Sequence, residues 1–371
     1  MEAAASVKEI RPRVMSVDAL RGFDMFWIMG GGEVVKQFIR LFANPMPEAL
    51  QNQFEHVDWI GFSAWDLIMP LFLFIVGVAM PLALGRRIKE GESVGHIYRH
   101  TAKRVILLFI LGMIAQGNLL SFNPAKLHLY SNTLQAIAAG YLVATIAMLH
   151  LRVAWQIVLC AALLVGFWLM MIFVPVPGHG AGVLTPQGNL AMFIDVTILR
   201  RFRDGSHYTW ILSSMGFAGT VLLGVFGGHI LQSQRTTQGR KALSLAGLGV
   251  ALIAGGLIWG LWFPIIKHIW TSSFVLFAAG LSYLLLAAFY TVIDVLQFKK
   301  WAFLFAVIGA NALLAYFAEG IVSARGIAEF LFGEGARNWS AMYSFPFALL
   351  VFGLLWLGLY ALYRKRIFIR L

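Results

Sequence analysis

Residues 63–87 read SAWDLIMPLFLFIVGVAMPLALGRR, and this stretch decides the fold class of the 371-residue chain. No charged residue stands between Asp66 and Arg86, and a helix that spans a bilayer needs about 20 predominantly apolar residues. The whole chain is 60% hydrophobic and 12% charged, whereas a soluble domain has about 25% charged residues. The stretch therefore predicts a membrane-spanning helix, and the composition predicts several more.

Ten segments of the sequence have the length and apolar character of spanning helices. They lie near residues 17–41, 65–85, 102–120, 132–149, 153–174, 208–232, 241–262, 272–295, 301–322 and 342–363. We therefore predict an all-α integral membrane protein, a polytopic bundle of about ten transmembrane helices. We assign the bundle to a single domain, residues 1–371, in which residues 1–14 form a polar tail on the cytoplasmic side.

Positive charge is distributed unevenly between the predicted loops. Of the 29 Lys and Arg residues, 19 fall on one side of the bundle, seven on the other side and three in the first segment. Lys and Arg are enriched in the cytoplasmic loops of membrane proteins. This rule predicts that both termini are cytoplasmic, and it explains the net charge of +12 without a nucleic-acid partner.

The first segment is unusually polar for a spanning helix. Asp18, Arg21 and Asp24 are spaced by three residues, so they share one helix face. An acidic residue such as Asp18 is favourable near the positive end of a helix, which gives this ladder a structural explanation. Asp24 lies deeper, and a carboxylate within the membrane is a functional candidate by default. The glycines at residues 30–32 permit close helix packing or the close approach of a ligand.

A loop histidine, His56, precedes the stretch quoted above. Two nearby tryptophans suit the aromatic belt at a membrane surface, so we expect His56 and Asp58 near the outer face. Asp66 has two interpretations. It either completes a capping box with Ser63 at the start of the helix, or it orients the imidazole of His56.

The sequence carries no clear signature of a metal or nucleotide site. Its single cysteine, Cys160, excludes a cysteine cluster and an intrachain disulfide. The stretch GHGAG at residues 178–182 lacks the strand-to-helix context of a phosphate-binding loop. We therefore expect no metal cofactor.

Seven motifs follow one another along the chain. They are RVMSVDALRGFDMFWIMGGGE at residues 13–33, HVDWIGFSAWDLIMPLFLFIVGVAM at 56–80, NTLQAIAAGYLVA at 132–144, GNLAMFIDVTIL at 188–199, FPIIKHIWTSSFVLFAAGLSYLLLAAFYTVIDV at 263–295, GANALLAYF at 309–317 and YRKRIFIRL at 363–371. In order and spacing they resemble the heparan-alpha-glucosaminide N-acetyltransferase family and its bacterial relatives. The resemblance covers almost the whole chain from Arg13 onward.

This resemblance implies a transmembrane acyltransferase that moves an acetyl group from cytosolic acetyl-CoA to the amine of a terminal glucosamine, with His56 as the active-site histidine. The chain departs from the family pattern at two places. The eukaryotic enzyme has an Asn before the glycines, where this chain has an apolar WIM, and a His where this chain has Glu319. We expect the reaction to carry over, while the acceptor, an amine or hydroxyl of a sugar, stays open.

The resemblance and the predicted topology together assign the site residues. We expect His56 to act as nucleophile or base, with Asp66 or Asp58 orienting it. We assign acyl-CoA binding to the first-segment ladder and the inner basic cluster, namely Arg21, Asp24, Arg86, Arg87, Lys103 and Arg104. We assign acceptor binding to Asn189, Asp195, Asn311 and Glu319. The basic cluster is explained equally well as a determinant of membrane topology alone. The polar residues within helices could equally form hydrogen bonds to neighbouring helices.

Two rival classes of function are compatible with the sequence. A transporter or flippase of a sugar or acyl conjugate would line its route with the same charges, and a structural membrane subunit would have no small-molecule site. Acyl transfer by the purified protein separates the enzyme from both rivals. As partners we expect the acyl donor, a saccharide acceptor and lipid, with a homodimer as the candidate assembly and the bacterial inner membrane as the location.

Overall fold

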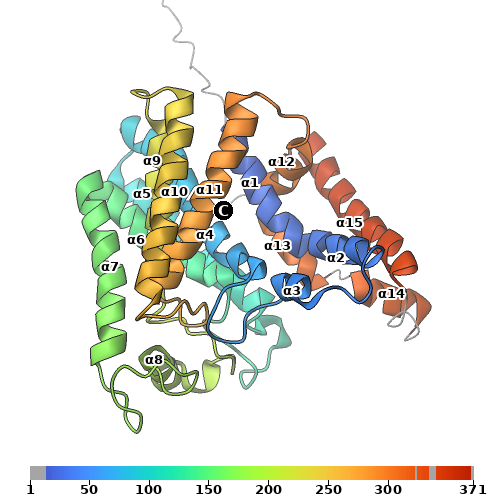
Figure 1. The fold of residues 1–371 in the computed structure, drawn as a ribbon. Helices are drawn as coiled ribbons and strands as arrows, with labels where there is room; N and C mark the ends of the chain where they lie inside the picture. Colours follow the sequence, from blue (N-terminus) through green and yellow to red (C-terminus); the bar gives the residue numbers. More distant parts are fainter. Residues whose placement is uncertain (1–13, 322–323, 334–339, 369–371) are drawn as a thin grey trace, which may run out of the picture.

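The computed structural model describes residues 14–321, 324–333 and 340–368, which form helices joined by loops (Figure 1). Within these residues, seven helices are long and apolar enough to cross a membrane. They cover Ala64–Ile88, Thr133–His150, Val153–Phe173, Ser214–Gln232, Gln238–Gly260, Ser272–Val295 and Met342–Arg364. The predicted all-α membrane fold is confirmed, and each of these helices coincides with a predicted span.

The first predicted span, residues 17–41, is a broken helix. It consists of α1 (Met15–Phe26), a π-helical turn η1 (Trp27–Gly31) and α2 (Gly32–Arg40). The break lies at Gly30, whose φ of 103° is a left-handed conformation that favours glycine. One glycine of the predicted triplet is therefore explained by backbone geometry. The two halves of the segment leave the break in different directions (Figure 1).

The third and ninth predicted spans also differ from long apolar helices. The third is α5 (Val94–Ala115), which is continuous but carries three basic residues in its first half. The ninth consists of two short helices, α12 (Phe303–Ala310) and α13 (Ala312–Ile321), which meet at the non-helical Asn311. The prediction of about ten helical segments therefore holds in outline, while the continuity of two of them is corrected.

The long helices form a buried centre and an exposed periphery. The central helices are α4 (Ile68–Lys89) and α9 (Ser214–Gln232), whose spanning stretches are 67% and 72% buried. The peripheral ones are α7 (Val153–Phe173), α10 (Gln238–Gly260) and α15 (Ala341–Arg364), which are 17–28% buried. Figure 1 shows α7 and α15 at opposite edges of the bundle. Apolar side chains on such exposed helices suit contact with lipid. The bundle is completed by α6 (Thr133–His150), α11 (Ser272–Tyr290) and α14 (Ala324–Phe332).

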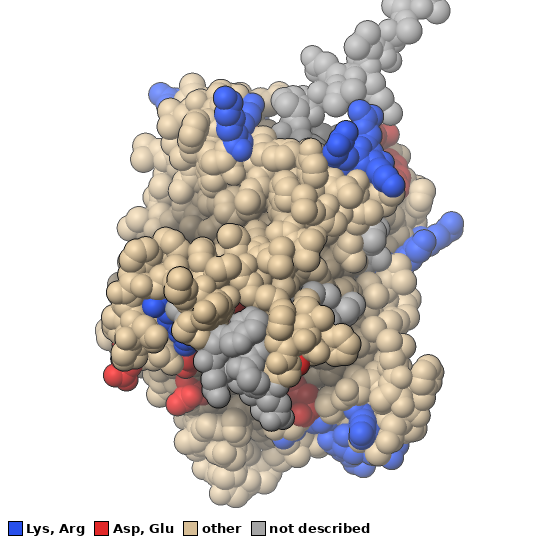
Figure 2. All heavy atoms as spheres, turned by 90° about the vertical axis from the view of Figure 1, so that its right-hand side faces the viewer, with Lys and Arg blue, Asp and Glu red and all other residues tan. Residues whose placement is uncertain are grey.

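Short elements stand in the loops between the long helices, and α3 and α8 lie toward the lower part of the view in Figure 1. They include α3 (Glu48–Gln51), η2 (Asn52–Phe54), η3 (Ala64–Leu67), η4 (Leu119–Ser121), α8 (Leu190–Leu199) and η5 (Arg200–Phe202). The C-terminal end of α11 continues into η6 (Thr291–Val295). Figure 2 shows Lys and Arg side chains mainly near the two ends of one face, with a band of other residues between them. Such a band suits a membrane belt, and the cytoplasmic placement of both termini stays a prediction.

Candidate active site

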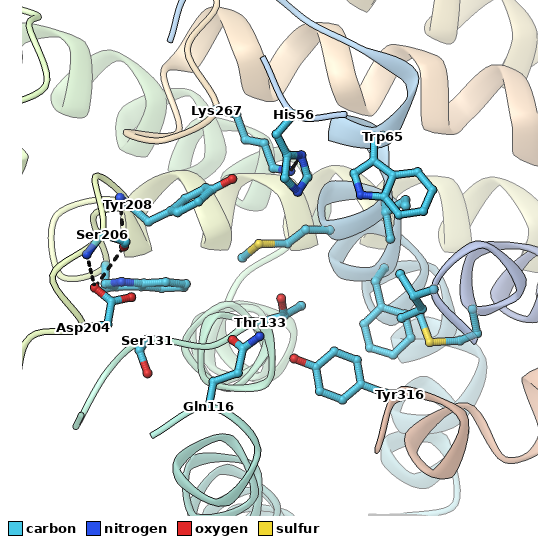
Figure 3. A pocket seen from close by; sticks show the side chains of 16 residues that line it. His56, Trp65, Gln116, Ser131, Thr133, Asp204, Ser206, Tyr208, Lys267 and Tyr316 are labelled. Carbon is cyan, nitrogen blue, oxygen red and sulfur yellow. Dashed lines mark hydrogen bonds between the residues drawn. The ribbon is translucent and has the colours of Figure 1, made fainter. Parts of the chain in front are cut away.

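A cavity of about 300 Å³ opens between α1, α4, α6 and α13, under the loops that join the helices (Figure 3). Its wall brings together His56, Tyr208 and Lys267, which come from three loops far apart in the sequence. Met25 and Ile28, from the polar first segment, also line it. The cavity is therefore the place where the predicted histidine segment and the first segment meet.

His56 is held by a buried carboxylate. Its Nδ1 lies 2.7 Å from Oδ1 of Asp66, whose side chain is 2% exposed, while the imidazole is 45% exposed. An ionised carboxylate only accepts hydrogen bonds, so we assign the proton to Nδ1, which donates it to Asp66. Nε2 is then the ring nitrogen whose lone pair is available to a ligand in the cavity.

The second oxygen of Asp66 closes the start of the following helix. Oδ2 accepts from the backbone N–H and the hydroxyl of Ser63, each at 3.1 Å, and from the backbone N–H of Val57 at 3.4 Å. The predicted capping box is confirmed. One carboxylate thus makes both of the contacts that the sequence offered as alternatives, one with each oxygen.

Lys267, on the loop between α10 and α11, completes a three-residue cluster. Its Nζ lies 3.1 Å from Oδ1 of Asp66 and 3.1 Å from Nδ1 of His56, and its side chain is 7% exposed. Burial lowers the pKa of Lys267, and the charge of Asp66 opposes that shift by favouring the ammonium form. Lys267 lies within one of the seven motifs, but no role was predicted for it, because the sequence does not indicate that a lysine in a loop is buried.

An aromatic stack supports the cavity wall beside this cluster. The rings of Tyr208 and His268 stack with centroids 4.4 Å apart, and His268 stacks on Trp59 at 5.3 Å. In Figure 3 the hydroxyl of Tyr208 points toward His56 and Lys267. Burial is the main cause that raises the pKa of Tyr208 and lowers that of His268 to about 4. Both rings are therefore neutral near pH 7.

The rest of the cavity wall is polar and aromatic. It carries Gln116, Ser131, Thr133, Asp204, Ser206 and Tyr316. The indole rings of Trp65, which lies beside His56 in Figure 3, and of Trp210 also line the cavity. Asp204 accepts from the hydroxyl and backbone N–H of Ser206 at 2.9 and 3.1 Å, both through Oδ1. Asn132, at the start of α6, donates to Gln116 at 3.0 Å and to Tyr316 at 2.9 Å, which ties three helices together. No role was predicted for these residues from the sequence, since they are scattered over five segments of the chain.

A model of the catalytic region of the heparan-alpha-glucosaminide N-acetyltransferase family matches residues 13–254, which is more than half of the chain. The chain belongs to this family. Human heparan-alpha-glucosaminide N-acetyltransferase is 24% identical to it, over 76% of the chain and 49% of the human protein. The chain therefore spans about half the length of this curated relative. The resemblance inferred from the motifs is confirmed, and neither comparison supports the transporter alternative.

Asp58, the second candidate for orienting His56, lies apart from the imidazole. Asp58 is exposed, and no hydrogen bond joins it to His56 among the described residues. The contact to Nδ1 comes from Asp66 instead. The capping-box spacing from Ser63 to Asp66 was the only sequence signal for that carboxylate's position.

Asn189 and Asp195, two of the residues predicted to bind the acceptor, do not line the cavity. Asn189 is buried and caps α8, accepting from the backbone N–H of Met192 at 2.8 Å. Asp195 is buried and accepts from the backbone N–H groups of Trp210 and Ile211 at 2.7 and 3.0 Å. Burial raises the pKa of Asp195 to about 6. Asp195 thus supports Trp210, which lines the cavity.

The two other predicted acceptor residues lie near the C-terminal helices. Asn311 is buried at the break between α12 and α13 and donates to the backbone carbonyl of Ile367 at 3.1 Å. Glu319 belongs to α13, and its side chain lies outside the described part of the structure. Tyr316, one turn earlier on α13, is the residue of this helix that reaches the cavity.

The predicted donor-binding residues fall into two groups, neither of which lines the cavity. In α1, Arg21 donates to Asp18 at 3.4 Å, and Asp24 is completely buried, with no hydrogen-bond partner for either carboxylate oxygen among the described residues. Asp24 directly precedes Met25, which lines the cavity.

The second group lies at the C-terminal end of α4 and in the first half of α5. Arg87 binds both oxygens of Glu92, at 2.6 and 2.7 Å, and the exposed Arg86 lies 3.9 Å from Glu90. The remaining members are Lys103, which is exposed, and Arg104, whose guanidinium lies 4.2 Å from the ring centre of Tyr141. Two of the four cations are therefore already paired with carboxylates.

The residues that the structure describes contain no group of three or more His, Cys, Asp or Glu side chains that could hold a metal ion. His96 and His100 stand four residues apart on α5, which places them on one helix face. His96 also lies 3.3 Å from Glu92, but these side chains do not make up such a metal-binding group in the described part of the chain.

Proposed function

We propose that the protein is a transmembrane acetyltransferase that moves the acetyl group of acetyl-CoA to an amine or hydroxyl of a sugar-type acceptor. The observation that carries the proposal is the imidazole of His56, which a buried Asp66 orients at the wall of a cavity. Membership of the acetyltransferase family supports it. The name of the human relative suggests an amino sugar as the acceptor.

His56 can serve either of two related mechanisms. In direct transfer, Nε2 takes a proton from the acceptor, and the freed lone pair attacks the thioester carbonyl. In a covalent route, Nε2 itself attacks, and the acceptor then removes the acetyl group from the ring. Both routes place positive charge on the imidazole, which the carboxylate of Asp66 stabilises at Nδ1, as in a Ser-His-Asp triad.

The cavity wall around His56 suits a sugar. The aromatic faces of Trp65 and Trp210 offer apolar surface to a sugar ring, and the amide of Gln116 and the hydroxyl of Thr133 offer hydrogen bonds to its hydroxyl groups. Asp204 supplies a carboxylate that would attract the ammonium of an amino sugar. This combination favours an amino sugar over a purely apolar acceptor.

The acyl donor would enter from the end of the bundle that the charge distribution assigns to the cytoplasm. Lys103 and Arg104 on α5 are the predicted cations left without a carboxylate partner among the described residues, so they are best suited to the phosphates of CoA. The acyl group would reach His56 along α1, past Asp24. With both termini cytoplasmic, the bacterial inner membrane is the expected location.

The test uses the purified full chain in proteoliposomes with radiolabelled acetyl-CoA on one side and glucosamine on the other. We expect labelled N-acetylglucosamine to appear, with release of free CoA. A transporter would instead move labelled substrate across the membrane unchanged, and this result would overturn the proposal. Incubation with the labelled donor alone separates the mechanisms, because stable label on the protein indicates a covalent intermediate.

A further inference from the structure

The ammonium of Lys267 has hydrogen-bonding capacity that the His56–Asp66 pair does not use. An ammonium has three N–H donors. Because Nδ1 of His56 donates its own proton to Asp66, it offers no lone pair to Lys267, and Asp66 is the acceptor that remains for Nζ among the described residues. Lys267 therefore keeps donors to spare at the wall of the cavity that it lines.

The loop that carries Lys267 is braced on both sides. The hydroxyl of Thr271 donates to the backbone carbonyl of Pro264 at 2.9 Å and accepts from the backbone N–H of Ile266 at 3.1 Å. Trp270 has a φ of 53°, a left-handed conformation that is uncommon for residues other than glycine. The position of the ammonium is thus fixed by the loop before any substrate binds, which is the condition for strong electrostatic stabilisation.

We propose that Lys267 is a second catalytic residue, which donates hydrogen bonds to the carbonyl oxygen of the acyl donor as negative charge develops there. The inference rests on the proposed acetyl transfer and goes beyond it by assigning the group that stabilises the oxyanion. The hydroxyl of Tyr208 points to the same end of the cavity and supplies a further donor (Figure 3). His56 then accepts and returns the proton, and Lys267 stabilises the negative charge on the oxygen.

The neutral acceptor amine forms a bond to the carbonyl carbon as it gives one proton to Nε2 of His56, and the π electrons of the carbonyl move to its oxygen. Lys267 donates to this oxyanion without giving up its proton. The carbonyl then re-forms, the C–S bond breaks, and the CoA sulfur leaves with the electron pair and takes the proton from His56. Charge on the oxygen is largest between these two events, which is where a fixed ammonium contributes most.

Lys267 has a simpler possible role than stabilising the oxyanion, namely balancing the charge of Asp66. Lys267 also balances the charge of Asp66, so a substitution of Lys267 could lower activity through Asp66 and His56 alone. A change in the reacting oxygen itself distinguishes the two roles. Sulfur is a weaker hydrogen-bond acceptor than oxygen. A dithioester analogue of acetyl-CoA, in which sulfur replaces the carbonyl oxygen, therefore loses most of the benefit of an oxyanion donor.

The experiment compares the rates with acetyl-CoA and dithioacetyl-CoA in the wild type and in Lys267→Met. We expect kcat with acetyl-CoA to fall roughly 10²–10³-fold in Lys267→Met, as for the loss of one oxyanion donor, with the affinity for CoA unchanged. The oxygen-to-sulfur rate ratio should shrink at least tenfold in this variant. His56→Ala leaves Asp66 and Lys267 paired, so it should lower both rates and leave the ratio as in the wild type. Lys126→Met, at an exposed loop position, serves as the control with unchanged kinetics.

An unchanged oxygen-to-sulfur ratio in Lys267→Met would overturn the inference and reduce Lys267 to a partner of Asp66. If this variant fails to fold, the same ratio is measured in the charge-balanced double variant Asp66→Asn/Lys267→Met, where a ratio equal to that of the wild type has the same meaning. A wild type that transfers no acetyl group would instead refute the proposed function. The two failures are therefore distinguishable.

Discussion

Oδ1 of the buried Asp66 lies 2.7 Å from Nδ1 of the half-exposed His56. The carboxylate is fixed by the start of α4, because its other oxygen accepts from Ser63. The imidazole therefore takes its orientation from the interior of the bundle and presents Nε2 to the cavity. A helix cap and a reactive side chain depend on the same carboxylate.

Replacement of His56 by Ala should abolish acetyl transfer, with kcat lowered at least about 10²–10⁴-fold, the range of general acid–base catalysis. The imidazole is 45% exposed, so the melting temperature should change little. Transfer of radiolabel from acetyl-CoA to glucosamine measures the effect. His179→Ala, at an exposed loop position, is the control and should be active. Near-normal transfer by His56→Ala would remove the histidine from the mechanism.

Replacement of Asp66 by Asn should harm both activity and stability. The amide cannot stabilise a charged imidazole, so kcat should fall roughly 10²–10⁴-fold. Lys267 would be left buried without its counter-ion, and breaking a buried ion pair from one side costs about 3–5 kcal/mol. Asp58→Asn is the matched control, because Asp58 is exposed. If Asp58→Asn loses activity and Asp66→Asn keeps it, the assignment of the orienting carboxylate is reversed.

The membrane fold could be predicted because apolar length is a local property of the sequence. The stretch quoted at residues 63–87 becomes the spanning helix Ala64–Ile88. The breaks in the first and ninth predicted spans could not be predicted in this way. They depend on the left-handed Gly30 and on Asn311, which donates to the distant carbonyl of Ile367. The length of an apolar stretch alone does not indicate either feature.

The site was only partly predictable for a related reason. The capping-box spacing from Ser63 to Asp66 is local, and it brought Asp66 into consideration beside His56. The partnership of Lys267 with Asp66 spans 201 residues, so nothing in the spacing of the sequence indicates it. Asn189 and Asp195 were recognised as polar residues in a motif, but a motif does not say whether a side chain faces the cavity or holds the backbone behind it.

Replacement of Asp24 by Asn should raise or preserve stability while it lowers activity. The carboxylate is completely buried without a hydrogen-bond partner among the described residues, and an unsatisfied buried polar group costs about 1–3 kcal/mol, more when charged. Such a cost is typical of functional sites. Asp18→Asn, on the same helix but partly exposed, should affect activity less. Melting curves measure the stability of both variants, and transfer rates measure their activity. A stable, fully active Asp24→Asn would mean that the carboxylate has no part in transfer.

The buried His268 should make stability depend on pH. Burial, and secondly repulsion from Lys267, lowers its pKa from 6.5 to about 4. Between these values the unfolded chain holds a proton that the folded protein does not, so stability is lost as the pH falls from about 6.5 toward 4. The full shift corresponds to about 3 kcal/mol, and the loss should be smaller because solvent screens the partly exposed ring. His268→Phe keeps a ring beside Tyr208 and cannot take up a proton. The melting temperature of the wild type should therefore fall relative to that of His268→Phe as the pH falls. A difference that is constant with pH would contradict this account.

The contact between α1 and α12 gives the sharpest test of the packing. A Cβ built on Gly22 would lie 1.7 Å from the carbonyl oxygen of Phe305, and one on Gly309 would lie 2.0 Å from that of Asp18. The two helix backbones therefore touch through this pair of glycines, and no rotation of a side chain can relieve an added methyl group. Gly22→Ala must push α1 away from α12.

We expect Gly22→Ala to lower the free energy of unfolding by about 1–3 kcal/mol or more, the usual effect of overpacking. Transfer should weaken as well, because α1 carries Met25 to the cavity wall. Gly353→Ala is the matched control. It also lies within a helix, α15, but its added Cβ would meet nothing within 4 Å, and alanine is favoured over glycine there by about 1 kcal/mol. The melting temperatures of the two variants should therefore move in opposite directions, and a Gly22→Ala protein as stable as Gly353→Ala would show that α1 and α12 are not in backbone contact.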